Sequence, residues 1–297
     1  MPVTLPPSVH VGPGVGDAEL LVVETPSGTA RLHTYGAHLV SWVPAGGADV
    51  LWVSPRSAYT PGAAIRGGVP LCFPWFGPHP SGTGPAHGFA RTSVWRLVEA
   101  TDLPDDDAHP GGGVAVTLAL TEQDVDPALT SVWPHPFEAR LRLVVGRELS
   151  LSLAVTNTGG TTFAVSEALH TYLAVGDVRR AIVTGLDGAT YVDKVADDVR
   201  VQVGPVTLDG ETDRVYTGTG ATTQVVESGR PTVTVAKSGS RSTVVWNPWA
   251  AKAAAMADLP DDGWTGFLCV ETANALDDTL TVEPGETRTI TARFTVG

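Results

Sequence analysis

The sequence is poor in cysteine, in basic residues and in long apolar runs. Its two cysteines, Cys72 and Cys269, both lie in apolar stretches, which favours buried thiols that act as small hydrophobic side chains. The sequence alone does not decide whether they form a disulfide. No apolar run approaches the roughly 20 residues of a membrane-spanning helix. The first residues lack the basic start and apolar stretch of a signal peptide. We therefore expect a cytoplasmic protein with reduced thiols and no membrane partner.

Basic residues are outnumbered, with 19 Lys and Arg against 32 Asp and Glu and a net charge of −13. Binding to nucleic acid or to an acidic membrane needs clustered Lys and Arg, so both kinds of partner are disfavoured. A small anionic substrate stays possible, because a few arginines in one pocket can reverse the field locally. The plain alternative is a solvated acidic surface that aids solubility. We expect a monomer rather than an obligate oligomer.

Helical signal is also scarce, since short helices are indicated only at 124–132 and 250–257. No strand–helix alternation appears, which argues against a parallel sheet of βαβ units. The 33 glycines and 23 prolines are about a fifth of the chain, and this composition suits many short strands joined by turns.

What the sequence does contain is period-two alternation of apolar residues, at 114–120, 141–145, 149–155, 233–235 and 290–296. The turn Gly146-Arg147-Glu148 between two of these runs predicts a hairpin. Loops are expected at 78–85 and 101–113, and a turn at 283–286. No shift in composition marks a boundary. The fold class predicted is all-β, a large antiparallel β-sandwich with few short helices, in a single domain over residues 1–297.

Two segments could line a ligand pocket. Arg66 precedes Gly67 and Gly68, which would let the backbone approach a ligand, and an aromatic, proline-rich wall follows at 73–77. Further on, His87 and Arg91 point to one face of an extended stretch, where they could grip a hydroxyl and an anion. The alternatives are a buried aromatic cluster with a surface arginine in the first segment and a loop cap with a surface ion pair in the second.

Two strand-like runs place a histidine and a carboxylate in the same kind of apolar surroundings. His170 and Glu271 each lie among apolar neighbours, where burial shifts pKa values. Such a pair can act as general acid and general base. A lone histidine on a strand is more often a satisfied core residue. Glutamate is rarely buried without a partner, so the alternative for Glu271 is a buried salt bridge, for instance to Arg66.

Two further segments are ambiguous. Asp193 follows an expected strand and could accept hydrogen bonds from sugar hydroxyls, or it could pair with Lys194 at the surface. The run Trp246-Asn247-Pro248-Trp249, followed by Lys252, is interpreted as a structural turn with packed indoles. Nucleotide-binding glycine loops, Cys-x-x-Cys and His-Glu-x-x-His metal motifs and the Gly-x-Ser-x-Gly elbow are absent. No metal or other cofactor is expected.

Taken in order, six pieces resemble the hexose-6-phosphate mutarotases (glucose-6-phosphate 1-epimerases), relatives of the aldose 1-epimerases. The resemblance covers roughly residues 15–296. The pieces are Arg66–Gly77, His87-Gly88-Phe89-Ala90-Arg91, Ala168-Leu169-His170-Thr171-Tyr172, Tyr191-Val192-Asp193-Lys194, Trp246-Asn247-Pro248-Trp249 and Cys269–Ala275.

The resemblance implies the galactose-mutarotase-like supersandwich fold, His170 as general acid and Glu271 as general base. It also implies substrate contacts from Arg66, His87, Arg91 and Asp193, with a small sugar phosphate as the partner. Members of the family often carry Gln where this chain has Ala86, so one hydrogen bond to the substrate is missing or comes from elsewhere.

Three functions are therefore weighed. The first is interconversion of the α and β anomers of an aldohexose 6-phosphate by acid–base ring opening. The second is the same reaction on free sugars, which Ala86 favours and Arg66 and Arg91 disfavour. The third is a non-catalytic carbohydrate-binding or sugar-sensing domain, which the presence of both His170 and Glu271 disfavours.

Overall fold

A computed structural model describes residues 3–79, 81–107 and 109–297 of the chain. In these residues the strands form four sheets, and every strand pair in them is antiparallel. The α-helices are short, α1 (Pro127–Thr130) and α2 (Trp249–Ala254), and neither could cross a membrane. Short 3-10 turns lie at Ala90–Thr92, Glu122–Asp124, Gly263–Gly266 and Leu276–Asp278.

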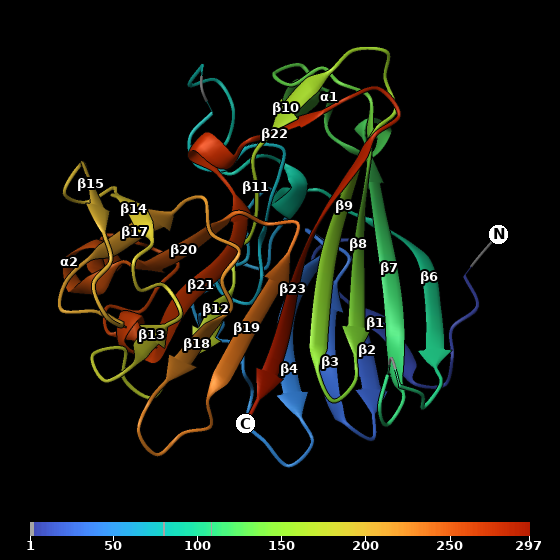
Figure 1. Cartoon of the computed structure of the whole chain (residues 1–297). Helices are drawn as coiled ribbons and strands as arrows, with labels where there is room; N and C mark the ends of the chain where they lie inside the picture. The colour runs from blue at the N-terminus through green and yellow to red at the C-terminus, as the bar shows by residue number, and fades with distance from the viewer. Residues whose placement is uncertain (1–2, 80, 108) are drawn as a thin grey trace.

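The nine-stranded sheet has the order β16-β13-β18-β19-β23-β9-β8-β7-β6. Its long central strands are the most prominent feature of Figure 1. The strands are β6 (Arg96–Leu103), β7 (Gly113–Thr121), β8 (Phe137–Val145), β9 (Leu149–Asn157), β13 (Ile182–Thr184), β16 (Val206–Thr207), β18 (Thr223–Val226), β19 (Val233–Ser238) and β23 (Thr287–Val296).

The eight-stranded sheet has the order β15-β14-β17-β20-β21-β11-β5, with β12 also paired to β21. It lies to the left of the long strands in Figure 1. The strands are β5 (Leu71–Cys72), β11 (Glu167–Leu169), β12 (Tyr172–Ala174), β14 (Thr190–Asp193), β15 (Asp198–Val201), β17 (Thr212–Tyr216), β20 (Ser242–Asn247) and β21 (Phe267–Asn274).

Two smaller sheets complete the sandwich. One has the order β1-β2-β3-β4, from β1 (Val9–Pro13), β2 (Glu19–Thr25), β3 (Gly28–His33) and β4 (His38–Pro44), and it contacts β7 and β8 through β2 and β3. The other pairs β10 (Phe163–Val165) with β22 (Leu280–Val282). The four-stranded and eight-stranded sheets thus cover one face of the nine-stranded sheet (Figure 1).

The main hydrophobic core lies between these layers. Leu268 and Val270 of β21 share it with Ile290 and Phe294 of β23, because alternate residues of a strand point to the same face. The other face of β21 is buried as well, against smaller apolar clusters that include Cys269 and Ala273. Every residue of β21 is therefore buried, and a polar side chain on either face is taken out of water.

Most sequence-based expectations about the fold are confirmed. The fold is all-β, the hairpin pairs β8 with β9 from Val145 opposite Leu149, and β23 covers the predicted last strand. The helices are shorter than expected, and β6 runs on to Leu103, so the loop starts later than residue 101. Both cysteines are free and buried.

Candidate active site

A cavity of about 310 Å³ opens on the outer face of the eight-stranded sheet, the face turned away from the main core. Residues from segments far apart in sequence line it. They are Arg66, Phe76, Ala86, His87, Arg91, His170, Lys194, Asp213, Val244, Trp246, Lys252 and Glu271. Five of the predicted site residues are thus brought together: Arg66, His87, Arg91, His170 and Glu271.

His170 reaches the cavity because the chain breaks its pairing there. It lies between β11 and β12, which both pair with β21, and its backbone N–H donates to the carbonyl of Pro70 at 3.0 Å. Its ring stacks on Tyr172, with centroids 4.9 Å apart and planes at 11°. The backbone hydrogen bond thus fixes the chain at residue 170, and stacking on Tyr172 restrains the imidazole.

Glu271 lies in the middle of β21, opposite Val244 of β20. It shares the outer face with Cys269 and Ala273, as strand alternation requires. Only 1% of its surface is exposed. Oε1 of Glu271 lies 3.4 Å from Nε2 of His170. The alternative, an ion pair between Glu271 and Arg66, does not form, because Arg66 pairs with Asp258.

Burial controls the electrostatics of this pair. It raises the pKa of Glu271 well above its ordinary value, and the nearby carboxylate of Asp213 raises it further, against Lys194. Burial also lowers the pKa of His170 well below its ordinary value, and the neighbouring His87 ring and the charges of Arg91 and Arg66 lower it further. Both shifts favour neutral forms. The pair therefore holds one proton between its two members over a wide pH range.

Four basic side chains line the cavity. Arg66 donates from Nε to Asp258 and from Nη1 to the Tyr172 hydroxyl, both at 3.0 Å. Lys194 lies 3.7 Å from Asp213, and Lys252 donates to Glu211 at 2.7 Å.

Arg91 differs from these three, because within the described residues no carboxylate lies within 4 Å of it. Its Nη2 donates to the carbonyl of Ala86 at 2.7 Å. Arg91 is thus the lining cation whose charge is least compensated by the protein, and the surface ion pair weighed as an alternative for it does not form.

His87 contributes a neutral ring. Burial lowers its pKa to about 3, and neighbouring cations add to the effect. Its Nδ1 accepts the N–H of Gly77 at 3.2 Å, which leaves the proton on Nε2 as a donor. Gly88 next to it has φ of +72°, and a Cβ there would lie 2.0 Å from the carbonyl oxygen of Phe73. Only glycine fits this close approach.

Two predictions about this site need correction. Asp193 lies outside the cavity, because alternation along β14 points Val192 and Lys194 to the outer face and Asp193 to the inner one. Its carboxylate accepts from the N–H groups of Val195 and Ala196 and lies 3.6 Å from Arg214. Asp193 therefore does not line this cavity, and Lys194 is paired with Asp213 instead.

The glycines after Arg66 also serve a different purpose from the one expected. A Cβ on Gly67 would lie 2.4 Å from the carbonyl oxygen of Trp52, and one on Gly68 would lie 2.2 Å from that of Leu39. They let the backbone pass close to other backbone, not to a ligand.

The sequence-based reasoning missed Lys194, Asp213, Trp246 and Lys252 as lining residues. Alternation along Thr190–Asp193 could have indicated Lys194, because Lys194 points to the same face as Val192. Alternation along Thr212–Tyr216 could have indicated Asp213, because Asp213 points to the same face as Val215. Trp246 lies opposite Asp213 across the β17–β20 pair. In the described part of the chain no three His, Cys, Asp or Glu side chains are arranged to hold a metal ion.

Comparisons with known proteins identify the family of this chain. The family model described as aldose 1-epimerase matches residues 19–295. A protein of Escherichia coli K12, provisionally named glucose-6-phosphate 1-epimerase, is 38% identical over 263 residues, with 87% of this chain and 84% of that protein covered. A Cenchrus ciliaris protein with the same provisional name is 35% identical, with 89% and 84% covered.

Solved structures support the same relationship. A structure from Salmonella typhimurium, described provisionally as a mutarotase, matches with a TM-score of 0.88 at 33% identity and covers 99% of this chain and 95% of its own. A galactose mutarotase-like protein from Lactobacillus casei shares the fold, with a TM-score of 0.72 at 16% identity over 94% of this chain and all of its own. The chain therefore belongs to the aldose 1-epimerase family and is an isomerase.

Proposed function

We propose that this epimerase interconverts the α and β anomers of an aldohexose 6-phosphate, with glucose 6-phosphate as the first candidate. The observation that carries the proposal is the contact of His170 with Glu271 in a cavity lined by Arg66, Arg91, Lys194 and Lys252. The paired groups supply proton transfer. The cations suit an anionic sugar better than a neutral one.

In the proposed reaction one proton moves across the pair. With His170 protonated and Glu271 ionised, Glu271 takes the proton of the C1 hydroxyl while His170 protonates the ring oxygen, and the C1–O5 bond breaks. The aldehyde turns about C1–C2. The ring closes when His170 takes the proton back from the C5 hydroxyl oxygen and Glu271 returns its proton to the carbonyl oxygen. The pair holds one proton throughout.

Ordinary pKa values would keep His170 protonated and Glu271 ionised at mildly acidic pH, whereas burial favours the neutral members. The neutral arrangement is the one required when the sugar is open. A bound phosphate dianion near His170 would favour the imidazolium by Coulomb attraction, and so would prepare the pair for ring opening. The charge of the substrate thus helps to keep His170 protonated, as ring opening requires.

The distribution of charge supports a phosphate on C6. Arg66 and Arg91 act on the pKa of His170, whereas Asp213 and Lys194 act on that of Glu271. In a pyranose the ring oxygen and C6 are both bonded to C5, so a group that protonates the ring oxygen lies beside the C6 substituent. We assign phosphate binding to Arg66 and Arg91, with Nε2 of His87 as a hydroxyl donor. Asp213 takes the sugar-hydroxyl role first assigned to Asp193.

The decisive experiment compares glucose, galactose and their 6-phosphates as substrates, with anomer exchange measured by NMR magnetisation transfer in wild type and Arg91→Ala. We expect Arg91→Ala to lower kcat/KM for glucose 6-phosphate by about tenfold to a hundredfold, as loss of a charged hydrogen bond implies, and to leave glucose nearly unchanged. Equal losses on both would favour a free-sugar mutarotase, which Ala86 also allows because it supplies no side-chain hydrogen bond. Sugar binding without faster exchange would favour a sensing domain.

A further inference from the structure

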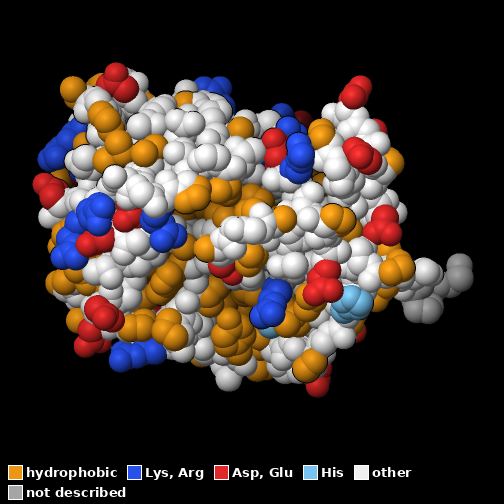
Figure 2. Space-filling view, turned by 90° about the horizontal axis from the view of Figure 1, so that it is seen from below, with side chains coloured by type: hydrophobic (Ala, Val, Ile, Leu, Met, Phe, Trp, Pro, Cys, Tyr) orange, Lys and Arg blue, Asp and Glu red, His pale blue; other side chains and the backbone are white. Residues whose placement is uncertain are grey.

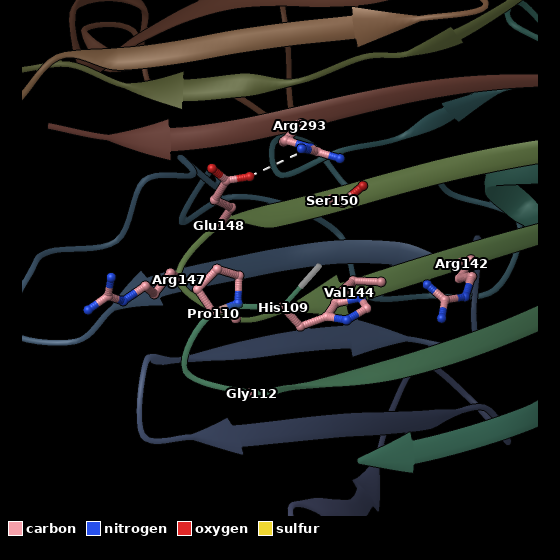
Figure 3. Close-up of a pocket in the computed structure, with 10 residues that line it drawn as sticks. His109, Pro110, Gly112, Arg142, Val144, Arg147, Glu148, Ser150 and Arg293 are labelled. Carbon is pink, nitrogen blue, oxygen red and sulfur yellow. Dashed lines mark ion pairs between the residues drawn. The ribbon is translucent and has the colours of Figure 1, made fainter. Parts of the chain in front are cut away.

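A second cavity, of about 370 Å³, lies on the outer face of the nine-stranded sheet. It sits at the end of the sheet where β8 turns into β9, and residues 109–112, just before β7, form its wall (Figure 3). The two large sheets share the main core on their inner faces. This cavity and the candidate active site therefore open on opposite sides of the sandwich.

Strand alternation builds the floor of this cavity. Arg142 and Val144 point outward because Leu141 and Leu143 fill the core. Val144 lies opposite Ser150, and Ser150 lies opposite Arg293 of β23. The short Ser150 between longer neighbours leaves a trough with an apolar patch at Val144 and arginines on its borders (Figure 3).

Hydrogen bonds hold the wall of the cavity in place. The N–H of Gly111 donates to Asp105 at 2.7 Å, and the N–H of Gly112 donates to the carbonyl of His109 at 2.9 Å. The wall adds Pro110 as a second apolar surface. The cavity is therefore formed by the fold itself and does not await a ligand to shape it.

The charge in this cavity is unusual for so acidic a chain. Within the described residues most Lys and Arg side chains lie within 4 Å of a carboxylate, but Arg142 and Arg147 do not. Arg293 lies 3.6 Å from Glu148, the carboxylate that lines the cavity. Three arginines and one glutamate thus line the cavity, and only Arg293 is paired with that glutamate (Figure 3).

Figure 2 views the end of the molecule where the β8–β9 turn lies. Its basic side chains are separated by acidic, apolar and uncharged ones and form no continuous basic surface. A small ligand fits this pattern better than a nucleic acid, which needs a basic stripe.

We propose that this cavity binds a small oligophosphate that carries a flat aromatic ring, a nucleoside polyphosphate by chemical class. Arginine is the side chain best matched to phosphate oxygens, because its planar donors bind them in pairs. Arg142 and Arg293 would hold the phosphates from two sides of Ser150. Val144 and Pro110 would pack against the ring.

The test is calorimetric titration of the full chain with ATP without magnesium and with inorganic pyrophosphate. Wild type is compared with Arg142→Ser/Arg293→Ser and with the matched control Arg140→Ser. Arg140 is on the same strand and the same face, but it pairs with Glu138 and does not line the cavity. We expect the double variant to bind ATP about tenfold or more weakly, and the control to bind it as wild type does.

Several outcomes would overturn the proposal. One is absence of saturable ATP binding to wild type up to about 10 mM. Another is equal ATP affinity in wild type and the double variant, which would assign the binding to the other cavity. Pyrophosphate binding as tight as that of ATP would remove the ring from the assignment. Should the double variant fail to fold, the single variants Arg142→Ser and Arg293→Ser serve as replacements, and each is expected to bind ATP more weakly than wild type.

Discussion

The two faces of the eight-stranded sheet each bury a glutamate, and the two glutamates differ in what surrounds them. Glu271 on the outer face contacts His170 beside a cavity. Glu167 on the inner face, fully buried, accepts one hydrogen bond from Asn274 at 3.3 Å. In the described part of the chain each has one buried carboxylate oxygen without a hydrogen-bond partner.

The comparison shows that burial alone does not make a proton-transfer site. Burial raises the pKa of both carboxyl groups. Glu271 can exchange its proton with a neighbouring imidazole and lines the candidate active site, whereas Glu167 accepts a hydrogen bond from an amide and lines neither of the two cavities described above. The position of a strand residue on one face or the other thus separates a candidate general base from a structural acid.

The largest expected effect is on catalysis, and it tests directly whether Glu271 and Glu167 differ in function. Glu271→Gln should lower the rate of anomer exchange by about 10²–10⁴, because a positioned base contributes roughly that much. Glucose 6-phosphate should still bind, since the arginines remain. Glu167→Gln is the matched control, with equal burial and the same chemical change, and should exchange anomers as wild type does. Exchange measured by NMR magnetisation transfer that survives Glu271→Gln would remove Glu271 from the mechanism.

The next effect concerns stability and belongs to Glu167. Burial raises its pKa from 4.5 to about 7, against the hydrogen bond from Asn274, which lowers it. The folded state therefore binds this proton more tightly than the unfolded state, and wild type loses stability as pH rises from about 4.5 to about 7. The shift corresponds to a loss on the order of 3 kcal/mol.

Glu167→Gln should remove this dependence and keep the bond to Asn274, because its amide oxygen can accept. Urea unfolding of wild type and variant at pH 5 and pH 8 measures the difference. The variant should gain stability relative to wild type at pH 8. A difference that is the same at both pH values would contradict the assigned protonation of Glu167.

How far the sequence predicts this molecule depends on which contacts are local. The β8–β9 hairpin and the last strand follow from alternation and turn residues, which act over a few positions. The pairing of β21 with β11, β12 and β20 joins segments remote along the chain, and alternation contains no information on which strands become neighbours. The sequence identifies the segments around His170 and Glu271, but the 3.4 Å contact between these residues is known only from the fold.

That Asp213 and not Asp193 lines the cavity has a simpler cause. Both aspartates lie in short strands of the same sheet, and a shift of one residue moves a side chain to the other face. Lys194 and Asp213 point outward with Val192 and Val215, as the alternation already indicated. The same alternation turns Asp193 to the inner face with Tyr191. The pKa directions at the site needed the structure, because they depend on burial on both faces of the sheet.

The smallest expected effect is the pH dependence of kcat/KM, and it tests whether His170 and Glu271 act as one unit. Ordinary values of about 6.5 and 4.3 would confine the active form to the range between them, and the rate would fall about a hundredfold by pH 8.5 as the histidine lost its proton. Burial moves the two pKa values in opposite directions, that of His170 down and that of Glu271 up. The form with one proton on the pair then persists across neutral pH.

We therefore expect kcat/KM for glucose 6-phosphate to change by less than about threefold between pH 6.5 and pH 8.5. Working above the second phosphate pKa of about 6 keeps the substrate largely a dianion, and uncatalysed exchange is subtracted at each pH. A fall of one decade per pH unit over this range would mean that a histidine with an ordinary pKa must be protonated in the free enzyme. In that case Glu271 and His170 would titrate separately, and the contrast with Glu167 would rest on access to the cavity alone.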